Sequence, residues 1–499
     1  METQNIRRVV IAGGGTAGWI AAASLSRLLG PLLDITLVES DAIGTVGVGE
    51  ATIPTHRTFH HLMGIDERDF MRATKATFKL GIAFEEWGGL GDRYIHSFGQ
   101  VGKSNWMGEF YNIWMYAQER GIGAELDAYC FELQAAEAGR FFTSDKANIN
   151  YAYHLDASLY AKFLRTFSEA KGVKRVEGLI EEVEQDGESG FITALKLQSG
   201  ERIEGDLFID CTGFRGMLIE QTLKTGYEDW THWLPTDSAL AVQTRSVGPA
   251  QPYTRAIAHH AGWRWRIPLQ HRVGNGLVFC SQNMQPDEAK EYLLGHVDGE
   301  PLTEPRLIRY KTGRRKKVWN KNCVALGLSS GFVEPLESTS IHLIQVGATR
   351  LVQQFPFAGI SEAIANHYNE QAERELEKIR DFIVLHYKLT ERDDSDFWRA
   401  RRDMPVPDSL AQRISLFREN GLAYQATDDL FRVDSWLQVM LGQRLKPKGY
   451  HHMGHLMTDD QLMTALGGLE ANISKAVSQM PSHQDFIDQY CAVPESETV

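Results

Sequence analysis

Residues 7–39 read RRVVIAGGGTAGWIAAASLSRLLGPLLDITLVE, and this stretch decides the fold class of the chain. The β-branched run Arg7–Ala12 predicts a strand, and the apolar stretch Ile20–Leu29 predicts a helix. Ile35–Glu39 predicts a second strand that ends in an acid. Strand, helix and strand in this order form a βαβ unit, which builds a parallel α/β sheet.

The glycines between the first strand and the helix follow the pattern G-x-G-x-x-G at Gly13, Gly15 and Gly18. The first glycine permits a tight turn, the second lets the backbone approach a pyrophosphate, and the third lets the helix pack on the strand. The helix N-terminus then faces the anion. Glu39 follows Gly18 by 21 residues, a distance at which a carboxylate accepts hydrogen bonds from the adenosine ribose. A chance glycine turn is the alternative, but strand context and acid together favour a dinucleotide site.

Strand-like segments return between residues 175 and 209, with turns at Asp186-Gly187 and Ser199-Gly200. These segments are Arg175–Gly178, Leu179–Val183, Phe191–Leu197 and Arg202–Ile209. They lead into Asp206–Gly213, DLFIDCTG, an apolar strand that ends in Asp-x-Thr-Gly. This arrangement is similar to the place where flavoproteins of the glutathione-reductase type close over FAD, and it favours FAD over NAD.

We therefore predict an α/β fold with a FAD-binding Rossmann-like domain of the glutathione-reductase or monooxygenase type, a β-rich substrate part and a helical C-terminal region. Helical patterns cover Ile360–His386 and Leu410–Glu419, and prolines separate them at Met404–Pro407. The expected FAD module within residues 1–350 (1–90, 151–215 and 311–350) is interleaved with substrate-binding segments (91–150 and 216–310). Residues 351–499 are expected to complete the substrate site.

Composition excludes several functional classes. Lys and Arg number 52 and Asp and Glu 65, a net charge of −13 that argues against a nucleic-acid partner. Five widely spaced cysteines without a CxxC pair predict neither disulfides nor a zinc site, and they fit the cytoplasm. The uncharged stretch Val9–Ser26 contains four glycines, so we expect no membrane helix. The histidines of Tyr450–His455 lack carboxylate or cysteine partners at ligand spacing, so we expect no metal.

Three further motifs carry a resemblance to a known family. They are Gly47–Pro54 (GVGEATIP), Trp263–Pro268 (WRWRIP) and Gly331–Thr339 (GFVEPLEST). By periodicity alone, Trp263–Pro268 is an ordinary strand with aromatic and arginine side chains on opposite faces. Together with GGGTAGW, the motifs resemble the flavin-dependent tryptophan halogenase family, whose WxWxIP pattern is matched at every defined position. The resemblance covers essentially the whole chain, including Arg392–Trp398.

The resemblance implies a halogenase that uses dioxygen, chloride or bromide, and reduced FAD (FADH2) from a separate flavin reductase. Hypohalous acid then travels through the protein to an electron-rich aromatic substrate. The implied catalytic residues are Lys79, which orients the oxidant, and Glu337, which stabilises the cationic ring and accepts its proton. By charge alone Glu334 would be chosen in place of Glu337, and a solvated helical lysine, like Lys75, is the alternative for Lys79.

The resemblance also assigns residues around the other reactants. Ser338 and Thr339 match the place where backbone N–H groups bind halide, with a plain surface turn as the alternative. His96 and Phe98 match an H-x-F element that stacks on the indole ring, with core packing as the alternative. The nearby aromatic stripe is more typical of core; it comprises Trp106, Phe110, Tyr111 and Trp114. The predicted cofactor-binding set is Gly13, Gly15, Thr16, Ala17, Gly18, Glu39, Gly49, Ala51 and Leu326.

The segment Tyr424–Trp436 departs from the tryptophan-specific members of the family. It is shortened and lacks the pair of tyrosines that helps to anchor the amino acid, so we expect indole or an indole derivative as the substrate. Two other functions stay open from the sequence: an aromatic monooxygenase that hydroxylates directly, and a non-catalytic flavoprotein. The sequence leaves the choice of halide and the assembly state open, a homodimer included.

Overall fold

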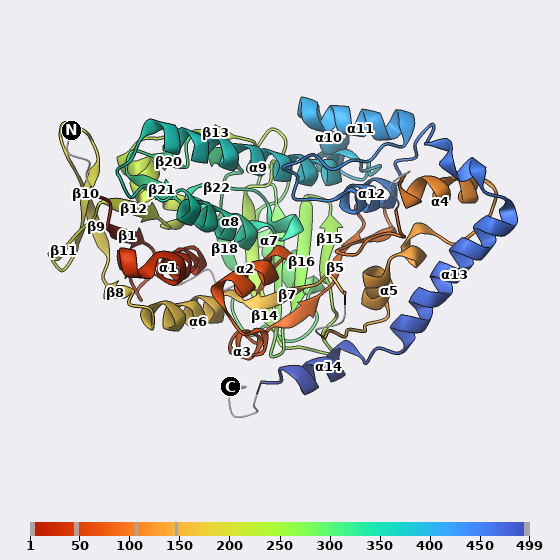
Figure 1. The fold of residues 1–499 in the computed structure, drawn as a ribbon, viewed down its shortest axis with the longest axis horizontal. Helices are drawn as coiled ribbons and strands as arrows, with labels where there is room; N and C mark the ends of the chain where they lie inside the picture. Colours follow the sequence, from red (N-terminus) through yellow and green to blue (C-terminus); the bar gives the residue numbers. More distant parts are fainter. Residues whose placement is uncertain (1–4, 44–48, 105–107, 145–147, 494–499) are drawn as a thin grey trace. The chain divides into compact units, whose positions relative to one another are not determined.

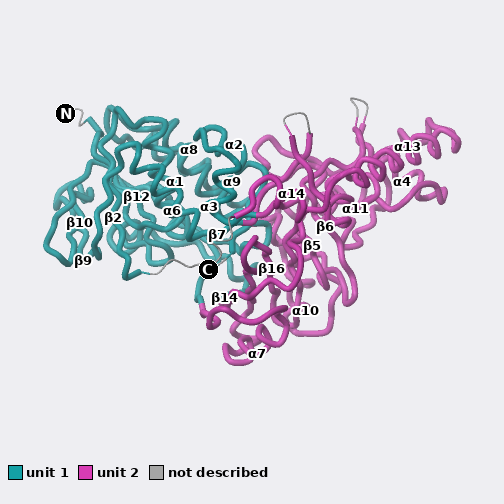
Figure 2. Tube along the Cα trace, turned by 90° about the horizontal axis from the view of Figure 1, so that it is seen from below, with its two compact units in different colours: residues 1–76, 155–237, 308–377 teal, residues 77–154, 238–307, 378–499 magenta. Residues whose placement is uncertain are grey.

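The computed structural model describes residues 5–43, 49–104, 108–144 and 148–493. The chain divides into two compact units, each built from three stretches of sequence (Figure 2). Unit 1 comprises Met1–Ala76, Leu155–Asp237 and Ile308–Glu377, and unit 2 comprises Thr77–His154, Ser238–Leu307 and Lys378–Val499. The domain boundaries expected from the sequence stay a prediction.

Unit 1 contains a six-stranded sheet in the order β20-β21-β12-β1-β2-β8 (Figure 1). Strand β1 pairs in parallel with β12 and with β2, so that Val9 lies opposite both Leu207 and Ile35. The predicted βαβ order and the Rossmann-like α/β class are therefore confirmed. The strands are β20 (Trp319–Asn320), β21 (Cys323–Ala325), β12 (Leu207–Asp210), β1 (Arg8–Ala12), β2 (Asp34–Glu39) and β8 (Lys174–Glu177).

Helix α1 (Thr16–Leu29) starts directly after the glycine turn, earlier than the predicted start at Ile20. Gly15 caps it with an extended backbone, φ −73° and ψ −172°. The first amides of a helix have no intrahelical partner, so those of α1 are available to an anion. On the other side α1 contacts α6 (Ala157–Glu169) and α8 (Ser340–Gln353).

The predicted strand Arg202–Ile209 is wrong as a single element. It forms β11 (Arg202–Glu204) in an antiparallel sheet and β12 in the parallel sheet. Asp206 lies at the break, because its carboxylate accepts the backbone N–H of Arg8 at 2.8 Å. The neighbours of β11 are β10 (Ile192–Leu197) and β9 (Ile180–Gln185).

Unit 2 is built on a second, seven-stranded sheet with the strand order β18-β14-β17-β16-β15-β5-β6, in which β18 (Arg306–Arg309) is an edge strand. The WRWRIP motif forms β16 in its middle, with Trp263, Trp265 and Ile267 buried. The predicted strand is thus confirmed. The strands are β14 (Ser238–Thr244), β17 (Val273–Phe279), β16 (Gly262–Pro268), β15 (Thr254–His259), β5 (Gly81–Glu85) and β6 (Arg93–Ser97).

A shorter antiparallel pair in unit 2 joins β4 (Thr77–Lys79) to β7 (Ala152–Asp156). Helices dominate the last part of the chain, and Pro405 and Pro407 separate α10 from α11 as the sequence predicts. These helices are α9 (Glu362–Lys388), α10 (Asp396–Asp403), α11 (Asp408–Asn420), α12 (Val433–Gly442), α13 (Asp459–Ser478) and α14 (His483–Tyr490).

The remaining elements are mostly short. They are α2 (Thr55–Met63), α3 (Glu67–Ala73), α4 (Phe110–Glu119), α5 (Phe131–Glu137), α7 (Pro286–His296), β3 (Gly49–Ala51), β13 (Tyr227–Asp229), β19 (Gly313–Arg315) and β22 (Gly331–Phe332). Within the described ranges, no helix combines the length and the apolar character needed to cross a bilayer. All five cysteines are free.

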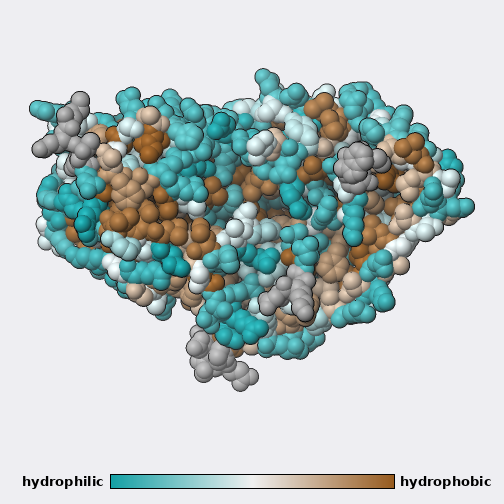
Figure 3. Space-filling view, viewed as in Figure 1, coloured by the Kyte–Doolittle hydropathy of each residue, from teal (hydrophilic) through white to brown (hydrophobic). Residues whose placement is uncertain are grey.

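Much of the face drawn in Figure 3 is hydrophilic, and hydrophobic residues lie there in separate patches. Large apolar side chains that are exposed include Leu32 and Ile43 in unit 1 and Leu456 and Met463 in unit 2. Single exposed apolar side chains are ordinary on protein surfaces. They carry no functional argument by themselves.

Candidate active site

The glycines of the predicted dinucleotide-binding turn differ in the space available for a side chain. Gly13 has φ +107°, and a Cβ there would lie 2.3 Å from the carbonyl oxygen of Cys211. A Cβ on Gly18 would lie 1.9 Å from the carbonyl oxygen of Gly13. A Cβ on Gly15 would meet no atom within 4 Å. The fold itself therefore requires Gly13 and Gly18, whereas Gly15 borders open space, as expected where the backbone approaches a pyrophosphate.

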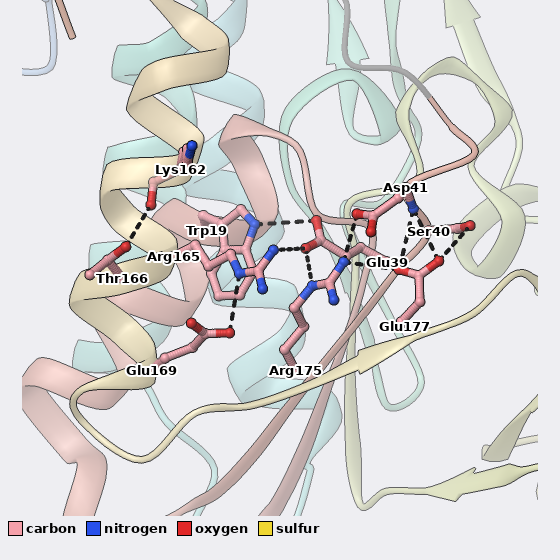
Figure 4. Close-up of polar contacts among 10 residues, drawn as sticks. All are labelled: Trp19, Glu39, Ser40, Asp41, Lys162, Arg165, Thr166, Glu169, Arg175 and Glu177. Atoms are coloured by element: carbon pink, nitrogen blue, oxygen red, sulfur yellow. Dashed lines mark hydrogen bonds and ion pairs between the residues drawn. The ribbon is translucent and has the colours of Figure 1, made fainter. Parts of the chain in front are cut away.

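Glu39 lies at the end of β2, where a bound ribose would need an acceptor (Figure 4). Its carboxylate accepts hydrogen bonds from Nε of Arg175 at 2.5 Å and from Nε1 of Trp19 at 3.3 Å. Arg165 adds an ion pair at 3.7 Å. A Cβ on Gly14 would lie 1.5 Å from Oε2 of Glu39, so the carboxylate covers that glycine. Trp19, Arg175 and Gly14 thus fix the acid, and the glycine pattern alone assigned none of them a role.

The Asp-x-Thr-Gly turn after β12 is organised by Asp210. Its buried carboxylate accepts the N–H of Thr212 at 2.9 Å and the N–H groups of Leu218 and Ile219 at 2.9 and 2.8 Å. Its carbonyl oxygen accepts the N–H of Leu326 at 3.0 Å. Asp210 therefore serves the turn, and it ties Leu326 to the carboxyl end of the parallel sheet.

Other predicted cofactor residues gather at the same end of unit 1. Ala17, in the first turn of α1, packs close to Gly327, because a Cβ on Gly327 would lie 2.8 Å from Cβ of Ala17. Thr16 begins α1 directly after Gly15. The structure thus brings the glycine turn, the first turn of α1 and the Leu326 segment together. These residues form a cradle that fits a dinucleotide.

The motif GVGEATIP is described from Gly49 onward, and its Gly47 and Val48 lie outside the described residues. Gly49 and Ala51 are buried in β3. Between them, burial raises the pKa of the Glu50 carboxyl to about 7. A carboxyl with such a pKa can exchange a proton near neutral pH.

Glu337 lies in a short 3-10 turn, Pro335–Glu337, before α8. Glu337 and Glu334, the alternative candidate for the catalytic acid, are both fully buried, so burial does not favour one of them over the other. Ser338 adopts φ +58°, and its N–H donates to the carbonyl of Pro335 at 3.1 Å. The Ser338 N–H therefore already has an acceptor in this turn, and a halide would have to compete with the Pro335 carbonyl for it.

Thr339 differs from Ser338 in what it offers to an anion. It precedes the first turn of α8, where amide groups lack intrahelical acceptors. Its side chain is 1% exposed, and among the described residues no group forms a hydrogen bond with its Oγ1. A buried hydroxyl without a partner at a helix N-terminus suits an anion.

A hydrogen-bonded group that the sequence did not indicate lies beside these motifs in unit 1. Nδ1 of His342, on α8, lies 2.9 Å from Oγ1 of Thr55, the residue that follows GVGEATIP. Nε2 of His342 lies 3.6 Å from Glu375, which also accepts from Arg350 at 2.9 Å. The group ties the start of α2 to the first turn of α8.

Lys79 lies on β4 in unit 2, opposite Ala152 of β7. Its side chain is fully buried, and Nζ lies 5.2 Å from the centre of the Phe98 ring. The alternative of a solvated helical lysine is therefore wrong, because the residue is part of a buried strand. An ammonium group over an aromatic face is attracted by the ring quadrupole.

His96 lies near the end of β6, and Phe98 comes directly after this strand, next to the Lys79 segment. The N–H of Phe98 donates to the carbonyl of Leu80 at 2.9 Å. The buried ring of His96 lies 5.5 Å from Phe382 and 6.1 Å from Phe431. Phe382 and Phe431 stack on each other at 3.8 Å. Phe431 comes from the segment that departs from the family pattern, whereas Phe382 had no signal in the sequence.

The aromatic stripe after His96 has mostly structural roles. The hydroxyl of Tyr111 accepts the N–H of Ala423 at 3.1 Å, and Nε1 of Trp114 donates to the carbonyl of Ala124 at 3.0 Å. Phe110 is buried against Tyr129. Trp106 lies outside the described residues.

The segment Tyr424–Trp436 surrounds Arg413. The guanidinium carbon lies 4.1 Å from the Tyr424 ring centre and 3.9 Å from that of Trp436. The guanidinium also donates to Asp429 at 2.7 Å, and Lys378 lies 3.3 Å from the other oxygen of that carboxylate. The buried acid of this segment is therefore already compensated by two cations of the protein.

Comparisons with known proteins show the family of the chain. A family model described as tryptophan halogenase matches residues 8–459. Tryptophan 6-halogenase SttH of Streptomyces toxytricini is 37% identical over 449 residues, covering 84% of this chain and 85% of that protein. Tryptophan 7-halogenase RebH of Lentzea aerocolonigenes is 37% identical over 447 residues, covering 84% and 83%.

Solved structures extend the likeness to the whole fold. Xcc4156, a flavin-dependent halogenase from Xanthomonas campestris, superposes with a TM-score of 0.97 at 54% identity, covering 98% of this chain and 99% of that chain. BrvH, a flavin-dependent halogenase from Brevundimonas sp. BAL3, gives 0.93 at 44% identity, covering 98% and 99%.

Proposed function

The chain belongs to the tryptophan halogenase family and is a flavin-dependent halogenase, and on this basis we propose that it halogenates indole or a small neutral indole derivative. In the net transfer a carbon–halogen bond forms, the halogen–oxygen bond of hypohalous acid breaks, and the ring proton leaves with the oxygen as water. The comparisons give no support to direct hydroxylation or to a non-catalytic flavoprotein.

The cofactor is proposed to lie in the cradle of unit 1. Bound FAD, supplied as FADH2 by a separate flavin reductase in the cytoplasm, would activate dioxygen and so oxidise chloride or bromide to hypohalous acid. The open space at Gly15 and the fixed carboxylate of Glu39 support this assignment. The proposed set is Gly13, Gly15, Thr16, Ala17, Gly18, Glu39, Gly49, Ala51 and Leu326, with Ser338 and Thr339 for the halide.

The observation that carries the proposal is the environment of Lys79. A fully buried ammonium 5.2 Å from the Phe98 ring can donate a hydrogen bond to hypohalous acid and orient it. His96 and Phe98 would hold the indole ring by stacking. Glu337 would stabilise the cationic ring and accept its proton. Free hypohalous acid in water would react without selectivity, so this positioning is essential.

The charges in unit 2 support the proposed substrate class. The ammonium and carboxylate of free tryptophan lose hydration on entering a protein and need paired partners. Asp429 is already compensated by Arg413 and Lys378, and the tyrosine pair is missing. An uncharged indole has no such requirement. The apolar rings of Phe382 and Phe431 beside His96 support the same choice.

The test is halogenation with a flavin reductase, FAD, dioxygen, bromide and indole, scored by mass spectrometry. Lys79→Ala should remove halogenated indole while flavin reoxidation continues, because oxidant formation and oxidant use involve different residues. Lys448→Ala is the control, since its exposed ion pair with Glu419 is on the surface. A parallel loss of reoxidation and product in Lys79→Ala would contradict the proposed role.

A further inference from the structure

Strand β4 presents two chemically different faces around Lys79. Side chains alternate along a strand, so Thr77 and Lys79 share one face and Phe78 points to the other. The Phe78 ring stacks on Phe141 at 4.1 Å. Across the pair, His154 of β7 lies opposite Thr77. His154, Thr77 and Lys79 therefore lie on the same face.

The hydrogen bonds on this face have a defined direction. Oγ1 of Thr77 lies 2.7 Å from the carbonyl oxygen of Pro268 and 3.0 Å from Nδ1 of His154. A hydroxyl has one proton, and the carbonyl can only accept, so Thr77 donates to Pro268 and accepts from Nδ1–H of His154. Nε2 of His154 then accepts from the hydroxyl of Thr254 at 3.0 Å.

This arrangement requires a neutral His154. Burial and the positive charge of Lys79 hold the pKa of His154 well below its usual value. Because the imidazole of His154 is neutral, the positive charge on the face shared with Thr77 comes from the ammonium group of Lys79. Thr254, His154, Thr77 and Pro268 thus form a continuous chain of four groups, and all four are in unit 2.

Pro268, the acceptor at the end of the chain, is the last residue of the WRWRIP motif. The backbone of β16 is fixed by pairing with β15 and β17 on both sides. The Trp265 indole fills the space above Gly276, where a Cβ would lie 2.0 Å from the ring. The motif therefore supplies a rigid carbonyl at a set distance from Thr77.

Accepting the proposed role of Lys79, we propose that Thr77 and His154 are positioning residues for halogen transfer. They hold the Lys79 strand to the end of the WRWRIP strand, so that the ammonium meets the oxidant in one orientation. The motif then contributes to the use of hypohalous acid through the Pro268 carbonyl. It does not contribute to oxidant formation.

The test compares Thr77→Val, which keeps the side-chain shape, with Thr77→Ser, which keeps the hydroxyl. Each reaction contains indole and a cyclic β-diketone, which traps hypohalous acid that escapes into solution. Thr77→Val should lower halogenated indole per flavin oxidised by roughly 10- to 100-fold and raise the trapped halogen correspondingly. Thr77→Ser should stay within about twofold of the parent, because the donated hydrogen bond is retained.

Thr390→Val is the matched control. The buried hydroxyl of Thr390 also donates to a carbonyl, that of Trp87, at 2.7 Å in unit 2. Its loss should lower the melting temperature without changing the ratio of halogenated indole to halogenated trap.

Should Thr77→Val fail to fold, Thr254→Val interrupts the same hydrogen-bonded chain at its other end, and a shift of halogen from indole to the trap is again expected. Three results would overturn the proposal. They are an unchanged ratio of halogenated indole to halogenated trap, equal losses of halogenated indole in Thr77→Val and Thr77→Ser, and a fall of both halogenated products together. Full activity of Lys79→Ala would instead overturn the proposed function.

Discussion

The guanidinium of Arg413 donates to the carboxylate of Asp429 at 2.7 Å while it lies between the rings of Tyr424 and Trp436. Asp429 is thereby removed as a partner for a substrate ammonium. A cation that is stacked between two aromatic rings and paired with an acid is also a poor partner for a substrate carboxylate. This pair is the structural basis for expecting a neutral substrate.

Indole should therefore have a higher kcat/KM than tryptophan under the same flavin supply. The ammonium and carboxylate of tryptophan lose hydration without gaining paired partners, whereas indole loses no charged hydration. The measurement is a competition between equal concentrations of the two substrates, with both brominated products quantified. A preference for tryptophan would show that other groups serve as anchors.

Gly15→Val should abolish FAD binding and leave the apoprotein folded. The added side chain meets no protein atom within 4 Å of its Cβ and enters the space expected for the pyrophosphate. Flavin absorbance after desalting and the melting temperature of the apoprotein are the two measurements. Gly187→Val, at another glycine with open space around its Cβ, should keep the flavin. Equal flavin retention in both variants would argue against this site.

Gly13→Ala should instead destabilise the apoprotein. Its Cβ would meet the Cys211 carbonyl at 2.3 Å, and its φ of +107° disfavours any side chain. A melting temperature equal to that of the parent would show that the turn can rearrange.

Glu337→Gln should slow halogenation by about 10² to 10³, or roughly 2 to 4 kcal/mol. The amide keeps the shape of the side chain but removes its charge and its ability to accept the ring proton. The measurement is the rate of halogenated indole formation under a constant supply of reduced flavin, with flavin reoxidation followed in parallel. Glu334→Gln is the internal comparison, because Glu334 is equally buried and should matter less. A larger loss at Glu334 would reverse the assignment.

The free energy of unfolding should fall as the pH decreases from about 6.5 towards 4. Burial lowers the pKa of His56 and His259 to about 3 and that of His483 to about 4. In this range the unfolded chain binds these protons and the folded chain does not, so acid favours unfolding by about 1.4 kcal/mol per pH unit for each group. Denaturant titrations at pH 7 and pH 5 measure the difference. His483→Gln should reduce the slope by one such contribution, and an unchanged slope would contradict it.

The sequence predicted those features that depend on neighbouring residues. The glycine spacing, the β-branched run Arg7–Ala12 and the acid at Glu39 specify the βαβ unit, because most of its contacts form within one short segment. The WRWRIP strand and the proline break before α11 follow for the same reason. The single strand expected at Arg202–Ile209 was wrong because Asp206 is bound by the distant residues Arg7 and Arg8.

Only the tertiary structure decided the environments of individual side chains. No local pattern indicates that Lys79 is buried in a strand, that Asp429 is compensated by Arg413, or that His154 points its proton at Thr77. These environments depend on partners that are distant in sequence. Thr77, for example, donates to the carbonyl of Pro268, 191 positions further along the chain. Burial and charge compensation are properties of the assembled interior, so they are set only when distant segments pack together.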